Sequence, residues 1–241
     1  MNGKSTERGG GEKMMNFKNE LLDLVFPNFC LGCGAEGELL CPDCSAKMVC
    51  RPAEICPICK RAERCFCPGS PLDGLWALAH YQDYLIAELI KKVKYDYLTG
   101  LAGAALSRHL EMFWQQAADC FSVRTVLIPV PLHHKRFLER GFNQSEIIAV
   151  ELSRVSGLKV ESGLLKRISH NEPQVGLSGQ RRRENIKGIF EVDYRAISSV
   201  WGRELLLIDD VYTTGSTLSE CAQTLKSAGF PKVSGLVWAA D

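Results

Sequence analysis

Short apolar runs alternate with helical patterns over most of the chain. Apolar side chains recur at helical spacing over residues 86–93, 98–114 and 145–155, and on one face after Thr217. Short runs that are mostly apolar predict strands, of the kind that are buried on both faces, at 75–81, 126–130 and 205–208. These strands and helices are predicted to form one α/β domain over residues 72–241.

The chain before residue 72 follows a different pattern. Residues 1–13 are polar and rich in glycine, so residues 1–15 are predicted to be a disordered leader. Residues 17–29 predict one short amphipathic helix that ends near Pro27. Proline, glycine and serine gather at residues 68–71 and indicate a boundary there. The predicted order is therefore a leader at 1–15, a region with the helix and most of the cysteines at 16–68, and the α/β domain at 72–241.

Composition and charge are those of an ordinary globular protein. Of 241 residues, 46% are hydrophobic and 24% are charged, and the net charge is +1. A nearly neutral chain gives no overall reason to expect binding to nucleic acid or to a membrane surface. No apolar run approaches the length that spans a bilayer, and residues 1–13 lack the apolar core of a signal peptide. We therefore expect a cytoplasmic protein that does not insert into a membrane.

Nine of the eleven cysteines lie between Cys30 and Cys67, in two sets of four with Cys50 between the sets. Two C-x2-C pairs that are close in sequence supply the four thiolates of a tetrahedral structural zinc site. A disulfide framework is the alternative, but it does not suit a chain without a secretory signal. The number of zinc ions, one or two, and a pairing interleaved across the sets stay open. The predicted zinc ligands are Cys30, Cys33, Cys41 and Cys44 in the first set, and Cys56, Cys59, Cys65 and Cys67 in the second.

Residues 204–217 combine an apolar strand, two acids and a small-residue loop. Asp209 and Asp210 follow the strand, and a loop of small and hydroxylated residues leads directly into a helix. The N–H groups of such a loop and the helix dipole favour a phosphate. Since a phosphate repels carboxylates, the two acids should face another part of the ligand, such as sugar hydroxyls or a magnesium ion. The predicted site residues here are Asp209, Asp210, Val211, Thr213, Thr214, Gly215, Ser216 and Thr217.

Two basic stretches supply the second half of the predicted site. The first follows the second predicted strand and includes Arg136 and Arg140, whose guanidinium groups can pair with a pyrophosphate in bidentate fashion. The second, residues 164–190, is long, polar and without periodicity, which is typical of a functional loop. From residue 135 to residue 187 there are eleven Lys and Arg against six Asp and Glu, a local charge of +5. A solvated charge run is the alternative to a ligand-binding face.

The strand, the two acids and the T-T-G-x-T loop together resemble the signature with which phosphoribosyltransferases bind phosphoribosyl pyrophosphate (PRPP). The stretch R-G-F-N-Q at residues 140–144, preceded by P-V-P-L-H, resembles one branch in particular, the ComF family of competence and DNA-utilisation proteins. Members of this family carry an N-terminal zinc ribbon before a phosphoribosyltransferase-type domain. The resemblance extends from about Cys30 to Ala239, and it includes the later Arg167, Gln174, Arg182 and Asn185.

The resemblance implies a type I phosphoribosyltransferase-like fold, a parallel sheet flanked by helices, with a small N-terminal double zinc ribbon. The implied ligand is PRPP with magnesium. Asp209 and Asp210 would hold the ribose hydroxyls, and residues 213–217 would hold the 5′-phosphate. The loop with the two predicted arginines would meet the pyrophosphate, and a mobile segment that includes Gln174 and Arg182 would close over it. The implied chemistry is displacement of pyrophosphate at the anomeric carbon of the ribose, and no catalytic residue is identified.

Two classes of function fit these features. In the first the protein is a phosphoribosyltransferase that moves phosphoribose to an acceptor, although no segment is recognised that would read a nucleobase. In the second it is a non-catalytic competence factor that binds single-stranded DNA on the basic face and takes PRPP as a regulatory ligand. The family role implies handling of incoming single-stranded DNA during natural transformation, with the DNA-uptake helicase machinery as a partner. Phosphoribosyltransferase-like domains often pair, so a homodimer is one expectation, while the oligomeric state stays open.

Overall fold

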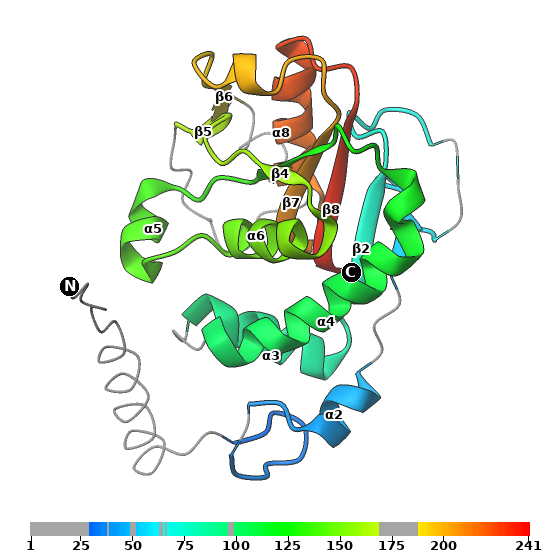
Figure 1. The fold of residues 1–241 in the computed structure, drawn as a ribbon, viewed down its shortest axis with the longest axis vertical. Helices are drawn as coiled ribbons and strands as arrows, with labels where there is room; N and C mark the ends of the chain where they lie inside the picture. Colours follow the sequence, from blue (N-terminus) through cyan, green and yellow to red (C-terminus); the bar gives the residue numbers. More distant parts are fainter. Residues whose placement is uncertain are drawn as a thin grey trace, which may run out of the picture. The chain divides into compact units, whose positions relative to one another are not determined.

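The computed structural model describes residues 29–37, 39–48, 52–62, 65, 67–95, 99–168 and 188–241 (Figure 1). The chain divides into two compact units, Met1–Lys47 and Met48–Asp241, and each is described by itself. The predicted leader and nearly all of the predicted helix at 17–29 lie outside the described residues. The domain boundaries predicted from the sequence stay predictions.

The described part of the first unit contains a short helix and a tight turn that carries Cys30 and Cys33. Helix α2 (Pro42–Lys47) follows an isolated antiparallel bridge between Phe29 and Glu36. The turn inside this bridge closes with a hydrogen bond from the backbone N–H of Gly34 to the carbonyl oxygen of Cys30, over 2.8 Å. The described part of this unit, residues 29–37 and 39–47, therefore consists of little more than the first cysteine set and the turns that present it.

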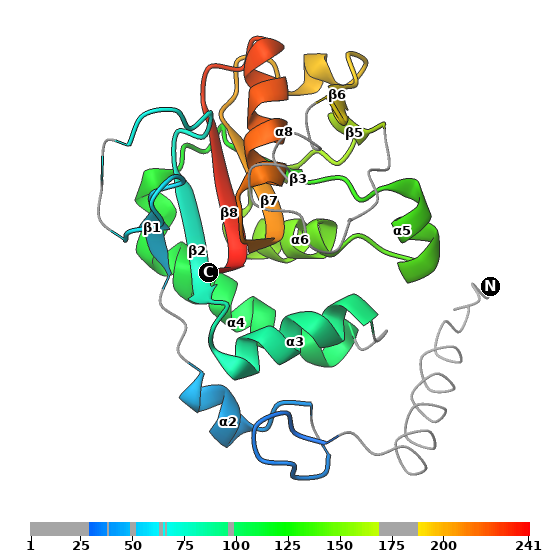
Figure 2. The ribbon, with the colours of Figure 1, turned by 180° about the vertical axis from the view of Figure 1, so that it is seen from behind.

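Six strands of the second unit form one sheet in the order β1-β2-β8-β7-β3-β4. All neighbours run parallel except β1, which lies antiparallel to β2 at one edge (Figure 2). Helices flank this sheet, and the predicted fold class, an α/β protein with a parallel sheet flanked by helices, is confirmed. The strands are β1 (Ala53–Ile55), β2 (Leu75–His80), β3 (Val126–Pro129), β4 (Lys159–Val160), β7 (Leu205–Tyr212) and β8 (Val233–Ala240).

Helices cover both faces of the sheet (Figures 1 and 2). On one face, α6 packs against β3 and β7, and α4 packs against α6. On the other face, α8 packs against β7 and β8. Within the described residues no helix has both the length and the apolar character that crossing a membrane requires. The helices are α3 (Tyr84–Tyr95), α4 (Thr99–Ala117), α5 (His134–Arg140), α6 (Gln144–Ser156) and α8 (Ser216–Ser227), with short 3-10 turns η1 (Ala118–Cys120) and η2 (Ile197–Ser199).

The continuous apolar run in β7 is explained by this three-layer arrangement. Side chains alternate between the two faces of a strand, so a strand with helices on both sides buries every one of them. Leu205 and Leu207 join the apolar cluster that includes Leu218 and Leu225 of α8. Leu206, between them, is also fully buried, although it lies outside that cluster.

A second, two-stranded sheet lies beside α8. Strands β5 (Leu165–Arg167) and β6 (Phe190–Val192) are antiparallel, with Lys166 opposite Glu191. β6 contacts α8, and Phe190 belongs to the apolar cluster on that face of the main sheet. The two strands hold the ends of residues 169–187, which lie outside the described residues together with the predicted site residues Gln174 and Arg182.

The three strands predicted from the apolar runs are confirmed, but β8 was not predicted. Its sequence, V-S-G-L-V-W-A-A, is interrupted by Ser234 and Gly235, yet the whole strand is buried. A Cβ atom added to Gly235 would lie 3.0 Å from Cδ1 of Leu75 and 3.4 Å from Cδ1 of Leu218. The glycine that breaks the apolar pattern is therefore needed for close packing of β8 against Leu75 of β2 and Leu218 of α8, on the face of the sheet that α8 covers.

A buried histidine lies under one face of the sheet. His109 of α4 is only 4% exposed, and its Nδ1 accepts a hydrogen bond from Nε1 of Trp238 in β8 over 3.1 Å. Burial, with a smaller contribution from Arg108, lowers the pKa of His109 from 6.5 to about 4. His109 is therefore neutral in the folded protein, and its neutral form makes the bond to Trp238.

This depressed pKa predicts a loss of stability in mild acid. In the unfolded chain His109 takes up a proton near pH 6.5, whereas in the folded protein it resists protonation down to about pH 4. The unfolded state therefore binds more protons in this window, and the free energy of unfolding should fall by about 3 kcal/mol as the pH drops from 6.5 to 4. Urea unfolding at several pH values measures this fall.

The matched variant is His109→Asn, whose side-chain oxygen can accept the Trp238 hydrogen bond without titrating. Its stability should depend less on pH between 6.5 and 4 than that of the unaltered protein. Equal pH dependence of the two proteins would show that His109 does not cause the loss.

Candidate functional site

The candidate site lies at the carboxyl ends of β3 and β7. Open parallel sheets bind ligands at this edge, because the loops that leave the strands can close around a ligand there. A pocket of about 180 Å³ occupies this edge. The structure thus brings segments that are far apart in the chain around one cavity. From the predicted site residues, its lining includes Asp209, Asp210, Val211, Thr217, Arg136 and Arg140.

Strand β7 carries the two acids from the buried sheet to the pocket. Asp209 and Asp210 are half-buried and follow Ile208, which is fully buried. The Oγ of Ser145 donates a hydrogen bond to Oδ1 of Asp209 over 3.0 Å, and the backbone N–H of Asp210 donates to the same oxygen over 2.9 Å. These two bonds fix the orientation of the Asp209 carboxylate at the wall of the pocket.

The hydroxyl-rich loop connects β7 to α8. Gly215 is the N-cap residue of α8 and has a φ of +73°, a conformation that suits glycine. The hydroxyls of Thr214 and Ser216 share a hydrogen bond of 2.7 Å across the glycine. Because glycine offers no side chain to cap the helix, an anion can take that role. Thr213 is exposed and does not line the 180 Å³ pocket, whereas Thr217 does.

The opposite wall of the pocket carries arginines. Arg136 and Arg140 lie four residues apart on α5, so both project from the same face of this helix. Both are half-buried, whereas their neighbours from Phe137 to Glu139 are exposed. The N-cap of α5 is His133, whose Nδ1 accepts a hydrogen bond from the backbone N–H of Lys135 over 3.2 Å. The strand, the cap and the short helix together bring two guanidinium groups to the pocket that the two carboxylates also line.

Arg167 is a third arginine in the pocket, and the predicted site did not include it. It is the last residue of β5. Its guanidinium carbon lies 5.6 Å from the centroid of the Phe190 ring. Burial and the nearby Arg136 lower the pKa of Arg167, while Cys221 and Asp209 raise it. Its Nε is buried without a hydrogen-bond partner, which an anionic ligand in the pocket would supply.

The R-G-F-N-Q stretch shapes the pocket, a role that its sequence alone did not reveal. Nη1 of Arg140 donates to Oε1 of Gln144 over 3.2 Å, and Gln144 is 4% exposed with its Nε2 unpaired. Asn143 donates from Nδ2 to the carbonyl oxygen of Val130 and accepts from the backbone N–H of Ser145. It thus caps α6 and ties this helix to the end of β3. The R-G-F-N-Q motif indicated the family in the sequence, but it did not indicate that Gln144 contacts Arg140 or that Asn143 contacts the end of β3.

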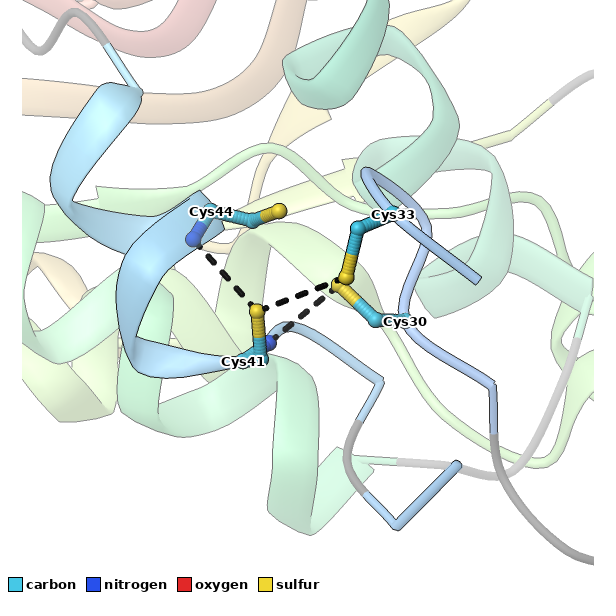
Figure 3. A group of neighbouring side chains, drawn as sticks. All are labelled: Cys30, Cys33, Cys41 and Cys44. Atoms are coloured by element: carbon cyan, nitrogen blue, oxygen red, sulfur yellow. Dashed lines mark hydrogen bonds between the residues drawn. The ribbon is translucent and has the colours of Figure 1, made fainter. Parts of the chain in front are cut away.

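The first cysteine set forms one cluster (Figure 3). Its four sulfur atoms all lie within 4.8 Å of one another, and those of Cys33 and Cys41 are 3.7 Å apart. A tetrahedral zinc ion with Zn–S bonds of about 2.3 Å separates its sulfur ligands by roughly 3.8 Å, so the cluster has the dimensions of such a site. Its members are Cys30, Cys33, Cys41 and Cys44.

The second cysteine set forms a cluster of its own, in the second compact unit. The sulfur of Cys65 lies 3.3 Å from that of Cys59 and 3.4 Å from that of Cys67. The structure therefore groups the cysteines within each set, not across the sets, and all ten described cysteines are free thiols. Its members are Cys56, Cys59, Cys65 and Cys67.

Acidity differs sharply between neighbours within each cluster. In the first, burial opposes ionisation of Cys30, but hydrogen bonds from backbone N–H groups prevail and lower its pKa to about 6. The neighbouring Cys41 and burial raise the pKa of Cys44 to about 12.

In the second cluster, hydrogen bonds from Arg61 lower the pKa of Cys59 to about 6, and the neighbouring Cys56 raises the pKa of Cys65 to about 12. At least one thiolate forms easily in each cluster, and a metal cation would allow the remaining thiols to ionise beside it. Both clusters are thus able to bind zinc.

Comparison with known proteins gives relatives along most of the chain, although no family model matches it. The chain is 38% identical over 112 residues to competence protein F of Haemophilus influenzae, a match that covers 46% of this chain and about half, 48%, of that protein. It is 34% identical over 177 residues to the DNA utilization protein YhgH of Escherichia coli O157:H7, covering 73% of this chain and 74% of the relative. It is 29% identical over 205 residues to competence protein ComFC of Bacillus subtilis, covering 80% of each.

Two solved structures are similar to parts of the chain. One, described as the allosteric regulatory enzyme of purine biosynthesis, has a TM-score of 0.39 and 17% identity and covers 61% of this chain and 30% of that one. The other, the AQ2163 protein of Aquifex aeolicus, has a TM-score of 0.35 and 15% identity. The match covers 68% of this chain and 87% of that protein. At these scores neither likeness bears on function. The sequence relatives, and above all the match to YhgH along three quarters of its length, show that the chain belongs to the ComF family of competence and DNA-utilisation proteins.

Proposed function

We propose that this protein binds PRPP together with magnesium in the pocket at the carboxyl ends of β3 and β7. One observation carries the proposal: two carboxylates, three arginines and Thr217 at the start of α8 line a single pocket of about 180 Å³. A ligand that suits this lining carries both anionic groups and hydroxyls. PRPP has a monophosphate, a diol and a pyrophosphate, in that order along the molecule.

The proposed roles follow from the chemistry of each group. Asp209 and Asp210 accept hydrogen bonds from the ribose hydroxyls, and the loop at residues 213–217 takes the 5′-phosphate at the start of α8. Arg136, Arg140 and Arg167 pair with the pyrophosphate. Magnesium supplies charge neutralisation on the pyrophosphate, and carboxylates and phosphate oxygens are the ligands it prefers. Gln174 and Arg182 are proposed to lie on the segment that closes over the ligand.

The reaction that this arrangement would support is the transfer of phosphoribose. The bond between the anomeric carbon and the pyrophosphate oxygen breaks, and the pyrophosphate leaves with the bonding electrons. A nucleophile of the acceptor forms the new bond and gives up its proton to solvent. The arginines stabilise the charge that develops on the leaving pyrophosphate, and the carboxylates hold the ribose while it becomes cationic. Binding of PRPP in this pocket does not depend on which acceptor receives the phosphoribose.

A second candidate function is the binding of single-stranded DNA by the same basic wall. It is favoured by the names of the relatives, which are competence and DNA-utilisation proteins. In this function the protein acts in the cytoplasm on incoming DNA, and PRPP serves as a regulatory ligand. The two functions share the arginines but differ in their need for Asp209 and Asp210, because carboxylates repel the backbone of DNA.

Calorimetric titration with PRPP tests the first proposal. The zinc-loaded protein should bind PRPP in the presence of magnesium and bind it much more weakly without the metal. The double variant Asp209→Asn, Asp210→Asn should lower the affinity by at least about 100-fold, since each acid contributes hydrogen bonds to the ribose or to magnesium. Glu204→Gln is the matched control, because Glu204 precedes β7 at its opposite end and pairs with Lys232 on the surface. Undiminished binding by the double variant would remove the acids from the site.

The two clusters predict the zinc content of the protein. The purified chain should hold two zinc ions, measured by elemental analysis per mole of protein. Cys30→Ser and Cys56→Ser should each lose one ion, because each removes one of four thiolates from a different cluster. Cys120→Ser, at an exposed cysteine outside both clusters, should keep two. A content of one ion in the unaltered protein would show that one of the clusters does not bind zinc.

Salt dependence tests the second candidate. If the arginine wall binds the backbone of a single-stranded oligonucleotide, affinity measured by fluorescence anisotropy should fall by about tenfold or more between roughly 50 and 200 mM salt. The double variant Arg136→Ala, Arg140→Ala should bind less tightly and with a shallower salt dependence. Affinity that is independent of salt would exclude the arginines as the DNA-binding surface.

A further inference from the structure

Tyr212 links the hydroxyl-rich loop to the second cysteine cluster. It is the last residue of β7, and its side chain is buried, at 2% exposed. Its hydroxyl donates a hydrogen bond to the carbonyl oxygen of Pro57 over 2.7 Å. Pro57 lies between Cys56 and Cys59, so this bond joins the cluster to a residue 155 positions further along the chain.

The Tyr212 side chain also lies directly against the loop. A Cβ atom added to Gly215 would be 2.1 Å from the Tyr212 hydroxyl oxygen and 2.4 Å from Cζ of its ring. Such distances are far below van der Waals contact, so the phenol group occupies the space next to the backbone of Gly215. The φ of +73° at Gly215 adds a second reason for glycine at this position. One hydroxyl group therefore touches the loop and the cysteine cluster at the same time.

The position of the Pro57 carbonyl depends on the cysteine cluster. The backbone N–H of Cys59 donates to the sulfur of Cys56 over 3.5 Å, and that of Lys60 donates to the carbonyl oxygen of Cys56 over 2.9 Å. Lys60 has a φ of +59°, which a residue with a side chain adopts at a cost. A cation bound by the four sulfur atoms would hold this turn closed, whereas thiolates without a cation would repel one another.

The hydrogen bond from Tyr212 is one of the contacts that join the cysteine cluster to the loop. A cavity of about 250 Å³ lies between the cluster and the loop, and Pro57, Ile58, Tyr212, Thr214 and Ser216 are in its lining. Ile58 remains 50% exposed beside it. Because the cluster and the loop face each other across a cavity, the Tyr212 contact can transmit a displacement of one to the other.

We propose that Tyr212 is a positioning residue through which metal in the second cysteine cluster holds the loop at residues 213–217 in the conformation that binds a phosphate monoester. This inference rests on the proposed PRPP site, where the monoester is the 5′-phosphate. Loss of the metal releases the Pro57 carbonyl, Tyr212 loses its anchor, and the loop loses the arrangement of its N–H groups. The pyrophosphate wall, formed by arginines of α5 and β5, does not depend on Tyr212.

Hydrogen exchange of the free, zinc-loaded protein tests the coupling without any ligand. Tyr212→Phe keeps the ring against Gly215 and removes only the hydroxyl. Amides at residues 213–219 should exchange about fivefold faster in this variant and in Cys56→Ser. The combination of the two should add little to either alone, because both break the same contact. Tyr194→Phe, at a tyrosine that is 73% exposed, and Cys120→Ser are matched controls and should leave these amides unchanged.

Ligand titration then separates positioning from general stability. With magnesium present, Tyr212→Phe should weaken PRPP binding by about tenfold and leave binding of inorganic pyrophosphate within about twofold. A merely structural role would weaken both ligands together. Where Cys56→Ser does not fold, chelation of zinc from the unaltered protein and from Tyr212→Phe replaces it, and chelation should speed loop exchange much more in the unaltered protein.

The outcomes distinguish this inference from the proposed function. Loop amides that are unchanged in Tyr212→Phe overturn the coupling, even where PRPP binds. Equal weakening of PRPP and pyrophosphate overturns the positioning role. Faster loop exchange in a protein that binds no PRPP supports the coupling and refutes the PRPP site.

Discussion

The burial of β7 between two layers of helices is the constraint on which the rest of the site depends. Its first four residues, Leu205–Ile208, are apolar and fully buried, and complete burial of one such side chain is worth about 1.5–3 kcal/mol. Its backbone is paired with β3 on one side and β8 on the other. A strand held in this way cannot shift by one residue without exposing its apolar side chains. The place that Asp209 occupies near the carboxyl end of β7 is therefore set by the hydrophobic core, not by a ligand.

Around this fixed point the fold assembles a pocket with charges of both signs. Ser145 orients Asp209, and Gln144 contacts Arg140, so the start of α6 touches both walls. Arg167 is half-buried and lies close to Arg136. Burial and the like charge of Arg136 lower the pKa of Arg167. Cations gathered in this way, together with the unpaired Nε of Arg167, are typical of a site prepared for an anion.

The two cysteine clusters differ in their relation to this pocket. The first belongs to the small compact unit at the beginning of the chain, whose described residues, 29–37 and 39–47, bury few apolar side chains. The second belongs to the same compact unit as the sheet and contacts β7 through Tyr212. A structural metal in the first cluster would stabilise mainly a segment too small to fold by burial alone. A metal in the second would in addition act on the loop that follows β7.

Local patterns in the sequence predicted the α/β class, three of the strands, the eight candidate zinc ligands, and the two acids and two of the three arginines that line the pocket. These features depend on local patterns, because a doubly buried strand must be continuously apolar and a metal site needs ligands at short spacing. Strand β8 escaped prediction, because Gly235 interrupts its pattern in order to pack against Leu75 and Leu218. Only the tertiary structure decided that Arg167 joins the pocket, that Ser145 holds Asp209 from 64 residues away, and that Tyr212 reaches Pro57. Contacts at such separations are set by how the layers pack, and spacing along the chain carries no record of them.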